Sequence, residues 1–128
     1  MTATYLLKVV TEFASAHTLR DYPGACSRMH GHNWKVELEA VATSLDDTGM
    51  GVDFKIMKAA ANEVGNRLDH RYLNDLEPFT SINPTAENIA AYMYREIAAI
   101  LNSDTIRVKA LTLWETDRAC VRYCEEYE

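Results

Sequence analysis

The stretch HNWKVELEAVA, residues 32–42, decides the fold because apolar and charged side chains alternate along its centre. One parity holds Trp34, Val36, Leu38 and Ala40, and the other holds Lys35, Glu37 and Glu39. Successive side chains of a strand point to opposite faces. The pattern therefore predicts a strand that buries one face and exposes the other.

Three further segments predict strands. Upstream, residues 4–14 are rich in β-branched and aromatic types, with one parity occupied by Tyr5, Leu7, Val9, Thr11 and Phe13. Downstream, residues 106–114 and 119–127 have a similar composition and are joined by a short connection around Thr116-Asp117. Two hairpins at opposite ends of the chain follow from this spacing.

Two helices are predicted between the hairpins. Asp53 is a suitable cap for a helix over residues 54–68, and Asn83-Pro84-Thr85 offers a cap and a first-turn proline for a helix over residues 85–101. Apolar side chains recur along both at spacings of three or four, namely Met57, Ala60, Val64 and Leu68, then Ile89, Met93, Ile97 and Ile100.

The element order is ββααββ, which predicts an α+β fold in a single domain over residues 1–128. We expect a four-stranded antiparallel sheet with both helices on one face. Such a sheet leaves its edges and second face open, a liability that proteins meet by covering or by assembly, so we expect an oligomer.

The composition excludes several classes of function. Thirteen Lys and Arg against nineteen Asp and Glu give a net charge of -6, which argues against a nucleic-acid partner. No window approaches the run of about 18 apolar residues that a membrane span needs, and no secretory signal precedes the first strand. Three cysteines without an export signal favour a reduced, cytoplasmic protein.

The histidines predict a metal site. His30 and His32 are two apart on an extended chain and turn their rings to one face, and His17 lies just past the first strand, within reach if the two strands pair. Three imidazoles with an open fourth position are the ligand set of a catalytic zinc site. The alternative is a chance HxH at a strand start, with no metal role.

Four other residues are candidates for chemistry. Cys26 lies four residues before His30, where a nearby cation would favour its thiolate, against the alternative of an inert buried cysteine. Asp69 can orient His70 for proton transfer, but from the pair alone a histidine interacting favourably with the dipole at the helix terminus is the favoured explanation. Glu115 can accept two hydrogen bonds from a heterocycle, but from the residue alone an ordinary solvated glutamate is favoured.

Taken together, these motifs resemble the 6-pyruvoyltetrahydropterin synthase family, and the likeness runs almost end to end. The segments that carry it, in family order, are FASAH (13–17), Cys26-x-x-x-His30-Gly31-His32, LDHRYLN (68–74), PTAEN (84–88) and WET (114–116). The three residues between Cys26 and His30 resemble the bacterial branch, which makes 6-carboxytetrahydropterin for queuosine. The animal branch, which makes the pyruvoyl product, has a longer spacer.

The resemblance implies a function for each candidate residue. His17, His30 and His32 would bind Zn²⁺, Cys26 would accept a proton, Asp69 and His70 would form a proton relay, and Glu115 would anchor the pterin ring. The implied fold is the tunnelling fold, whose subunits assemble into an oligomeric β-barrel, a hexamer built as a dimer of trimers. The implied sites lie between subunits.

The implied reaction converts 7,8-dihydroneopterin triphosphate to 6-carboxy-5,6,7,8-tetrahydropterin, with loss of triphosphate and acetaldehyde. One alternative is the pyruvoyl reaction, which keeps the carbon fragment, and another is a zinc- or pterin-binding module without catalysis. The triphosphate requires local cations despite the acidic net charge, and Arg20, Arg28 and Lys35 lie near the cysteine–histidine motif in the sequence.

Overall fold

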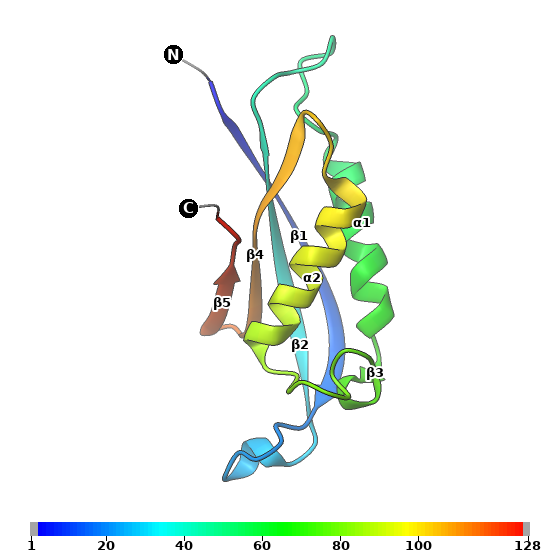
Figure 1. Ribbon diagram of the computed structural model, residues 1–128, viewed down its shortest axis with the longest axis vertical. Coiled ribbons are helices and arrows are strands. Elements are labelled where there is room, and N and C mark those ends of the chain that lie inside the picture. Colours follow the sequence, from blue (N-terminus) through cyan, green and yellow to red (C-terminus); the bar gives the residue numbers. More distant parts are fainter. Residues whose placement is uncertain (1–2, 127–128) are drawn as a thin grey trace.

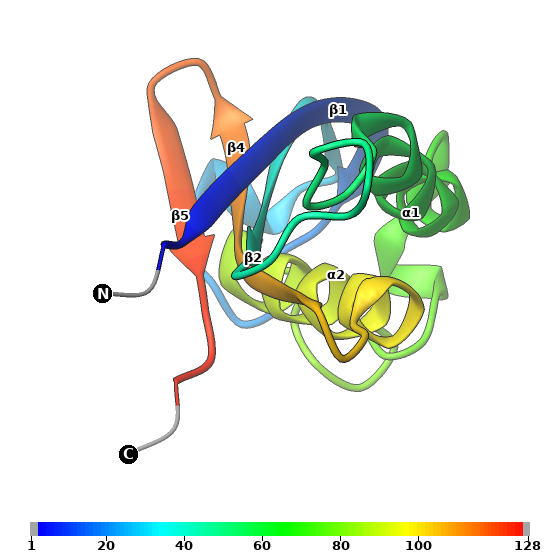
Figure 2. The ribbon, with the colours of Figure 1, turned by 90° about the horizontal axis from the view of Figure 1, so that it is seen from above.

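The computed structural model describes residues 3–126, a twisted sheet with two helices against one face (Figures 1 and 2). The strands are β1 (Tyr5–His17), β2 (His30–Ala42), β3 (Arg71–Tyr72), β4 (Ile106–Thr116) and β5 (Ala119–Tyr123). The helices are α1 (Phe54–Leu68) and α2 (Ala86–Leu101), and two short 3-10 turns are η1 (Ala25–Ser27) and η2 (Leu73–Asp75). The α+β fold predicted from the sequence is confirmed.

The sheet has five strands in the order β3-β1-β2-β4-β5, so the prediction of four antiparallel strands was wrong. The four long strands are antiparallel as expected, but β3 runs parallel to β1 and pairs only with Ser15 and Ala16. β3 lies beside β1 because the two residues before it bond to Ala14. The Ala14 N–H donates to the Asp69 carboxylate (2.8 Å), and the Ala14 carbonyl accepts from the His70 N–H (2.6 Å). A strand of two residues is too short for any periodicity to reveal.

The β1–β2 hairpin pairs residue by residue, from Tyr5 opposite Ala42 to His17 opposite His30. Its buried parity is the one that the alternation predicted, and it packs under the helices through Val9, Phe13, Trp34, Val36 and Leu38. Because His17, His30 and His32 continue this parity, the register carries their rings to the helix-covered face at one end of the sheet.

Both helices begin and end close to the predicted residues. Asp53 caps α1 by accepting from the Lys55 N–H (2.8 Å), and the whole predicted stripe of α1 is buried. Thr85, rather than Asn83, caps α2. Ile100 is 44% exposed and Leu101 is buried in its place, because residue 101 lies a full turn beyond Ile97 on the packed face.

The outer strands leave hydrogen-bonding edges open. β3 covers only the end of β1, and β5 pairs only with β4 within the described residues. β5 ends at Tyr123, and Tyr127 of the predicted strand lies outside the residues that the structure describes.

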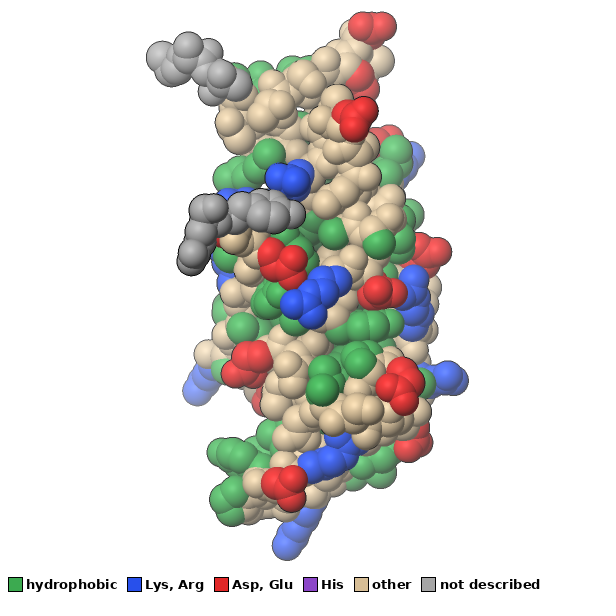
Figure 3. Space-filling view, viewed as in Figure 1, with side chains coloured by type: hydrophobic (Ala, Val, Ile, Leu, Met, Phe, Trp, Pro, Cys, Tyr) green, Lys and Arg blue, Asp and Glu red, His purple; other side chains and the backbone are tan. Residues whose placement is uncertain are grey.

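Acidic and basic side chains are interspersed on the face seen in Figure 3. In the described part of the chain, no helix has both the length and the hydropathy to cross a membrane.

Candidate metal centre

Three histidines meet where the β1–β2 hairpin ends. His17 closes β1 and lies opposite His30, the first residue of β2, while His32 lies opposite Ser15. One ring nitrogen from each histidine lies within 4.8 Å of the others, and the Nε2 atoms of His17 and His30 are 3.0 Å apart. The sequence-based prediction that these rings converge is confirmed.

Neighbouring groups fix the orientation of the rings. Nδ1 of His17 lies 2.7 Å from the Pro84 carbonyl oxygen, and Nδ1 of His30 lies 2.7 Å from the Arg28 carbonyl oxygen. The fully buried indole of Trp34 packs edge-on against His17 and His32, with ring centroids 5.3 and 5.1 Å away. The triad is therefore held by contacts behind it, as metal ligands usually are.

These contacts leave the other ring nitrogens as a donor set for a cation. A carbonyl oxygen only accepts, so Nδ1 of His17 and of His30 carries the proton, and in the neutral rings each Nε2 presents a lone pair. Two lone pairs facing each other across 3.0 Å repel unless a cation lies near both. Nε2 of His32 is also buried and without a hydrogen-bond partner. The residues present thus fit a bound metal ion.

Burial favours the metal-binding form of two histidines of the triad. Desolvation lowers the pKa of His17 and of His32 below the usual value. The nearby Glu115 carboxylate acts to raise the pKa of each ring, but desolvation is the larger effect. A hydrogen bond to the Pro84 carbonyl also acts to raise the pKa of His17, without reversing the shift. The rings of His17 and His32 are therefore held neutral, and neutral imidazole is the ligand form.

Glu115 lies at the edge of the triad. The β4–β5 ladder pairs Trp114 with Cys120 and then Thr116 with Ala119, so Glu115 has no partner and sits at an irregularity in β4. Its Oε1 is 3.7 Å from Nε2 of His32, and its side chain is 36% exposed. Glu115 therefore lies in the site, although its position in the sequence alone favoured an ordinary solvated glutamate.

Asp69 and His70 form a pair beside the same end of β1. Oδ2 of Asp69 is 2.9 Å from Nδ1 of His70, and Oδ1 accepts from the Ala14 N–H. The backbone bond from Ala14 and then the bond to His70 lower the pKa of the Asp69 carboxyl. His70 has a positive φ of 58°, rare for a residue with a side chain, and its ring is 83% exposed.

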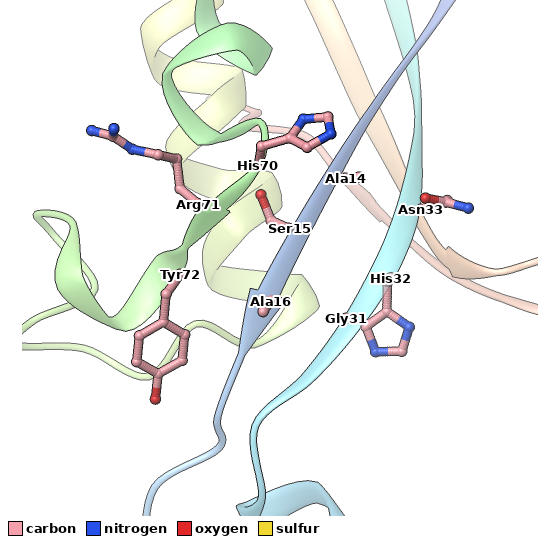
Figure 4. A pocket seen from close by; sticks show the side chains of 9 residues that line it. All are labelled: Ala14, Ser15, Ala16, Gly31, His32, Asn33, His70, Arg71 and Tyr72. Atoms are coloured by element: carbon pink, nitrogen blue, oxygen red, sulfur yellow. The ribbon is translucent and has the colours of Figure 1, made fainter.

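A shallow groove of about 510 Å³ lies beside the end of β1 (Figure 4). Its lining includes His70 of the pair and His32 of the triad, from either side of the end of β1, but not Asp69, His17 or His30. Arg71 and Tyr72 line it as well, and sequence reasoning did not single out either residue. Their one signal in the sequence is that they directly follow Asp69-His70.

Cys26 lies outside this cluster in the folded chain. It sits exposed in η1, within the loop that joins β1 to β2, and its carbonyl accepts from the Leu19 N–H at 3.0 Å. Among the described residues, no hydrogen bond joins its thiol to the triad. Its exposure removes the alternative of an inert buried cysteine, while its role in proton transfer stays a prediction.

The cations near the motif have different surroundings. The Arg20 guanidinium donates to the carbonyls of Ile82 and Phe79, at 3.2 and 2.6 Å, which gives it a structural role. Lys35 points to the opposite face of β2, where it pairs with Glu37. Arg28 has no side-chain hydrogen bond or ion pair in the described part of the chain.

Known proteins resemble the chain over most of its length. Residues 6–126 match the family model described as 6-pyruvoyl tetrahydropterin synthase. A 6-carboxy-5,6,7,8-tetrahydropterin synthase of Synechocystis sp. is 39% identical over 90 residues, which cover 66% of this chain and 68% of that protein. The protein of the same name from Rickettsia conorii is 30% identical over 128 residues, covering 86% and 93% respectively.

Solved structures of 6-pyruvoyl tetrahydropterin synthases have the same fold as this chain. The structure of the Caenorhabditis elegans 6-pyruvoyl tetrahydropterin synthase matches with a TM-score of 0.86 and 25% identity, covering 98% of each chain. A Plasmodium vivax 6-pyruvoyltetrahydropterin synthase matches with a TM-score of 0.78 at 17% identity, a likeness of fold. With the family model spanning nearly the whole sequence, the chain belongs to the 6-pyruvoyl tetrahydropterin synthase family.

Proposed function

We propose that the protein is a 6-carboxy-5,6,7,8-tetrahydropterin synthase. It converts 7,8-dihydroneopterin triphosphate to 6-carboxytetrahydropterin, releasing acetaldehyde and triphosphate, as a step of queuosine biosynthesis. The observation that carries the proposal is the convergence of three imidazoles, with a carboxylate beside them and an Asp–His pair at the same end of β1. The curated relatives that bear this name, in Synechocystis sp. and Rickettsia conorii, support the choice of reaction.

The proposed cofactor is Zn²⁺, held by His17, His30 and His32. Three imidazole ligands leave a position open for substrate, which is typical of catalytic rather than structural zinc sites. When bound, the metal supplies Lewis-acid polarisation of the substrate side-chain hydroxyls, which makes protons at the adjacent carbons easier to remove. Pro84 and Arg28 contribute the carbonyls that keep Nε2 of His17 and His30 free to bind it.

The chain's own residues move the protons and orient the ring. Cys26 accepts a proton from the substrate side chain. The Asp69 carboxylate holds Nδ1 of His70, which leaves Nε2 of that ring to exchange a proton across the groove. The Glu115 carboxylate accepts two hydrogen bonds from the amidine-like edge of the pterin.

The protein is proposed to act as a homo-oligomer, a hexamer built as a dimer of trimers, with its sites at subunit interfaces. The open edges of β1 and β5 support this assembly, since an exposed strand edge pairs readily with another chain. The proposed compartment is the cytoplasm, in keeping with three cysteines that remain free thiols.

A second candidate is the reaction of a 6-pyruvoyltetrahydropterin synthase, which eliminates triphosphate without cleaving a carbon–carbon bond. The observation in its favour is the match to the Caenorhabditis elegans structure along 98% of the chain. A third is a non-catalytic module in which the metal only stabilises the β1–β2 hairpin. The three candidates differ in their products and in what happens when the metal is removed.

Removing the metal with a chelator should leave a folded protein that no longer consumes 7,8-dihydroneopterin triphosphate. The reason is that His17 sits on a core that is already closed by Trp34, Phe13 and the helices, so the fold does not depend on the metal. Circular dichroism, thermal melting and substrate consumption, measured before and after chelation, check this expectation.

Adding one equivalent of Zn²⁺ back to the stripped protein is the control, and it should restore turnover. A protein that unfolds on chelation, as structural zinc domains do, would instead support the non-catalytic module.

A further inference from the structure

Two asparagine side chains continue the pairing of β1 beyond its last residue, His17. Asn74 accepts from the Thr18 N–H and donates to the Thr18 carbonyl, both at 2.9 Å. Asn83 accepts from the Arg20 N–H at 2.8 Å and donates to the Arg20 carbonyl at 3.0 Å. Each side-chain amide satisfies both backbone groups of one residue, as a neighbouring strand would, so the backbone of residues 18–20 is held in place.

The opposite side of this segment holds Cys26. Thr18 and Arg20 direct their backbone groups toward the asparagines, and Leu19, between them, donates its N–H to the Cys26 carbonyl at 3.0 Å. The segment therefore has hydrogen-bond partners on two sides, the asparagine side chains on one and Cys26 on the other. The backbone of Cys26 is therefore tied through one residue to the segment that Asn74 and Asn83 hold.

The segment that provides Asn83 also contacts the metal triad. Asn83 is followed by Pro84, whose carbonyl accepts from Nδ1 of His17 at 2.7 Å. The Asn83 carbonyl accepts from the Asn88 side chain at 2.9 Å, which fixes it to the first turn of α2. Two neighbouring residues thus orient a histidine of the triad and support the loop of the cysteine.

The loop that carries Cys26 has no buried residue over positions 21–29, so hydrophobic packing does little to fix its position. Residues 21–29 are all exposed, whereas Asn74, Asn83 and the segment 18–20 that they hold are partly buried. Hydrogen bonds from the amides of Asn74 and Asn83, together with those of the Arg20 guanidinium and the Tyr72 hydroxyl, hold the segment 18–20 that leads into the loop. A displacement of about 1 Å in a reacting group can cost roughly 100-fold in rate.

We propose that Asn74 and Asn83 are positioning residues that set the place of Cys26 relative to the histidine triad. They act through residues 18–20 and need not touch the substrate. The inference rests on the proposed function, because it assumes that the Cys26 thiol takes part in the reaction.

The test uses Asn83→Asp and Asn74→Asp in the zinc-loaded protein. Aspartate keeps the size and the acceptor oxygen but replaces the N–H donor with a second oxygen, which repels the backbone carbonyl. We expect kcat to fall by about 10- to 100-fold, with KM and zinc content unchanged. Hydrogen exchange of the peptide covering residues 18–29 should become several-fold faster.

Asn62→Asp is the matched control, because Asn62 is exposed on α1 and the substitution adds the same charge. It should leave kcat and the exchange of the loop unchanged. If one asparagine variant does not fold, as judged by circular dichroism, the other still decides the question, since each amide holds a different residue.

Three results would overturn the inference: an unchanged kcat, an unchanged loop exchange, or a fall in kcat that follows loss of zinc. The last would mean that the asparagines act through the triad and not through Cys26. A wild-type protein that consumes no 7,8-dihydroneopterin triphosphate would instead refute the proposed function. In that case the hydrogen-exchange rate of residues 18–29 in the two variants would decide by itself whether the asparagines position Cys26.

Discussion

The Cys26→Ala variant is expected to bind zinc as the wild type does and to lose turnover by about 10²- to 10⁴-fold, the contribution of a positioned proton-transfer group. The reason is that the thiol lies in an exposed loop outside the cluster of ring nitrogens, so its removal leaves the triad intact. Metal analysis and steady-state kinetics on the same preparation measure both quantities.

Cys120→Ala is the matched control for this substitution. Cys120 is also an exposed free thiol, but it lies in β5 and is paired with Trp114, away from the loop of Cys26. Its replacement should leave both zinc content and kcat unchanged. Loss of zinc from the Cys26 variant would make the thiol a metal ligand and contradict its assignment to proton transfer.

Substituting His32 with alanine should abolish both metal binding and turnover. His32 contributes a buried ring nitrogen with no hydrogen-bond partner, and its removal leaves two of the three ligands. Loss of an outer partner of a ligand costs about 10- to 100-fold in metal affinity, and loss of a ligand itself should cost more. Titration with Zn²⁺ against a competing chelator gives the affinity directly.

His70→Ala separates this effect from a general loss of imidazole. His70 lies outside the triad with an exposed ring, so the variant should keep its metal while turnover falls. A His32→Ala variant that holds zinc as tightly as the wild type would contradict the proposed ligand set.

Much of the architecture was predictable because long elements carry many repeats of a pattern. The alternation across residues 32–42 predicted the buried face of β2, and the same parity carried His30 and His32 toward one point. His17 could be added because pairing of the two strands brings their ends together, even though the loop between them spans residues 18–29. Both helices were predicted closely for the same reason, since each has about four turns of apolar spacing.

The rest depended on contacts that no local pattern encodes. β3 is only two residues long and forms because Asp69 and His70 bond to the backbone of Ala14. The approach of Glu115 to His32 depends on an irregularity between β4 and β5, and a one-residue slip in pairing has no signature in composition. Asn83 was expected only as a helix cap and Asn74 only as part of the LDHRYLN motif, and neither pattern indicates the bonds that they make to Thr18 and Arg20.

The most direct test of the proposed function is to identify the products formed from 7,8-dihydroneopterin triphosphate by the purified, zinc-loaded protein. Mass spectrometry of the pterin, together with derivatisation and quantification of any aldehyde, would follow both halves of the substrate. The proposed function predicts 6-carboxytetrahydropterin and acetaldehyde in equal amounts, with one triphosphate released for each turnover. A 6-pyruvoyl product formed without acetaldehyde, or an unchanged substrate, would contradict it.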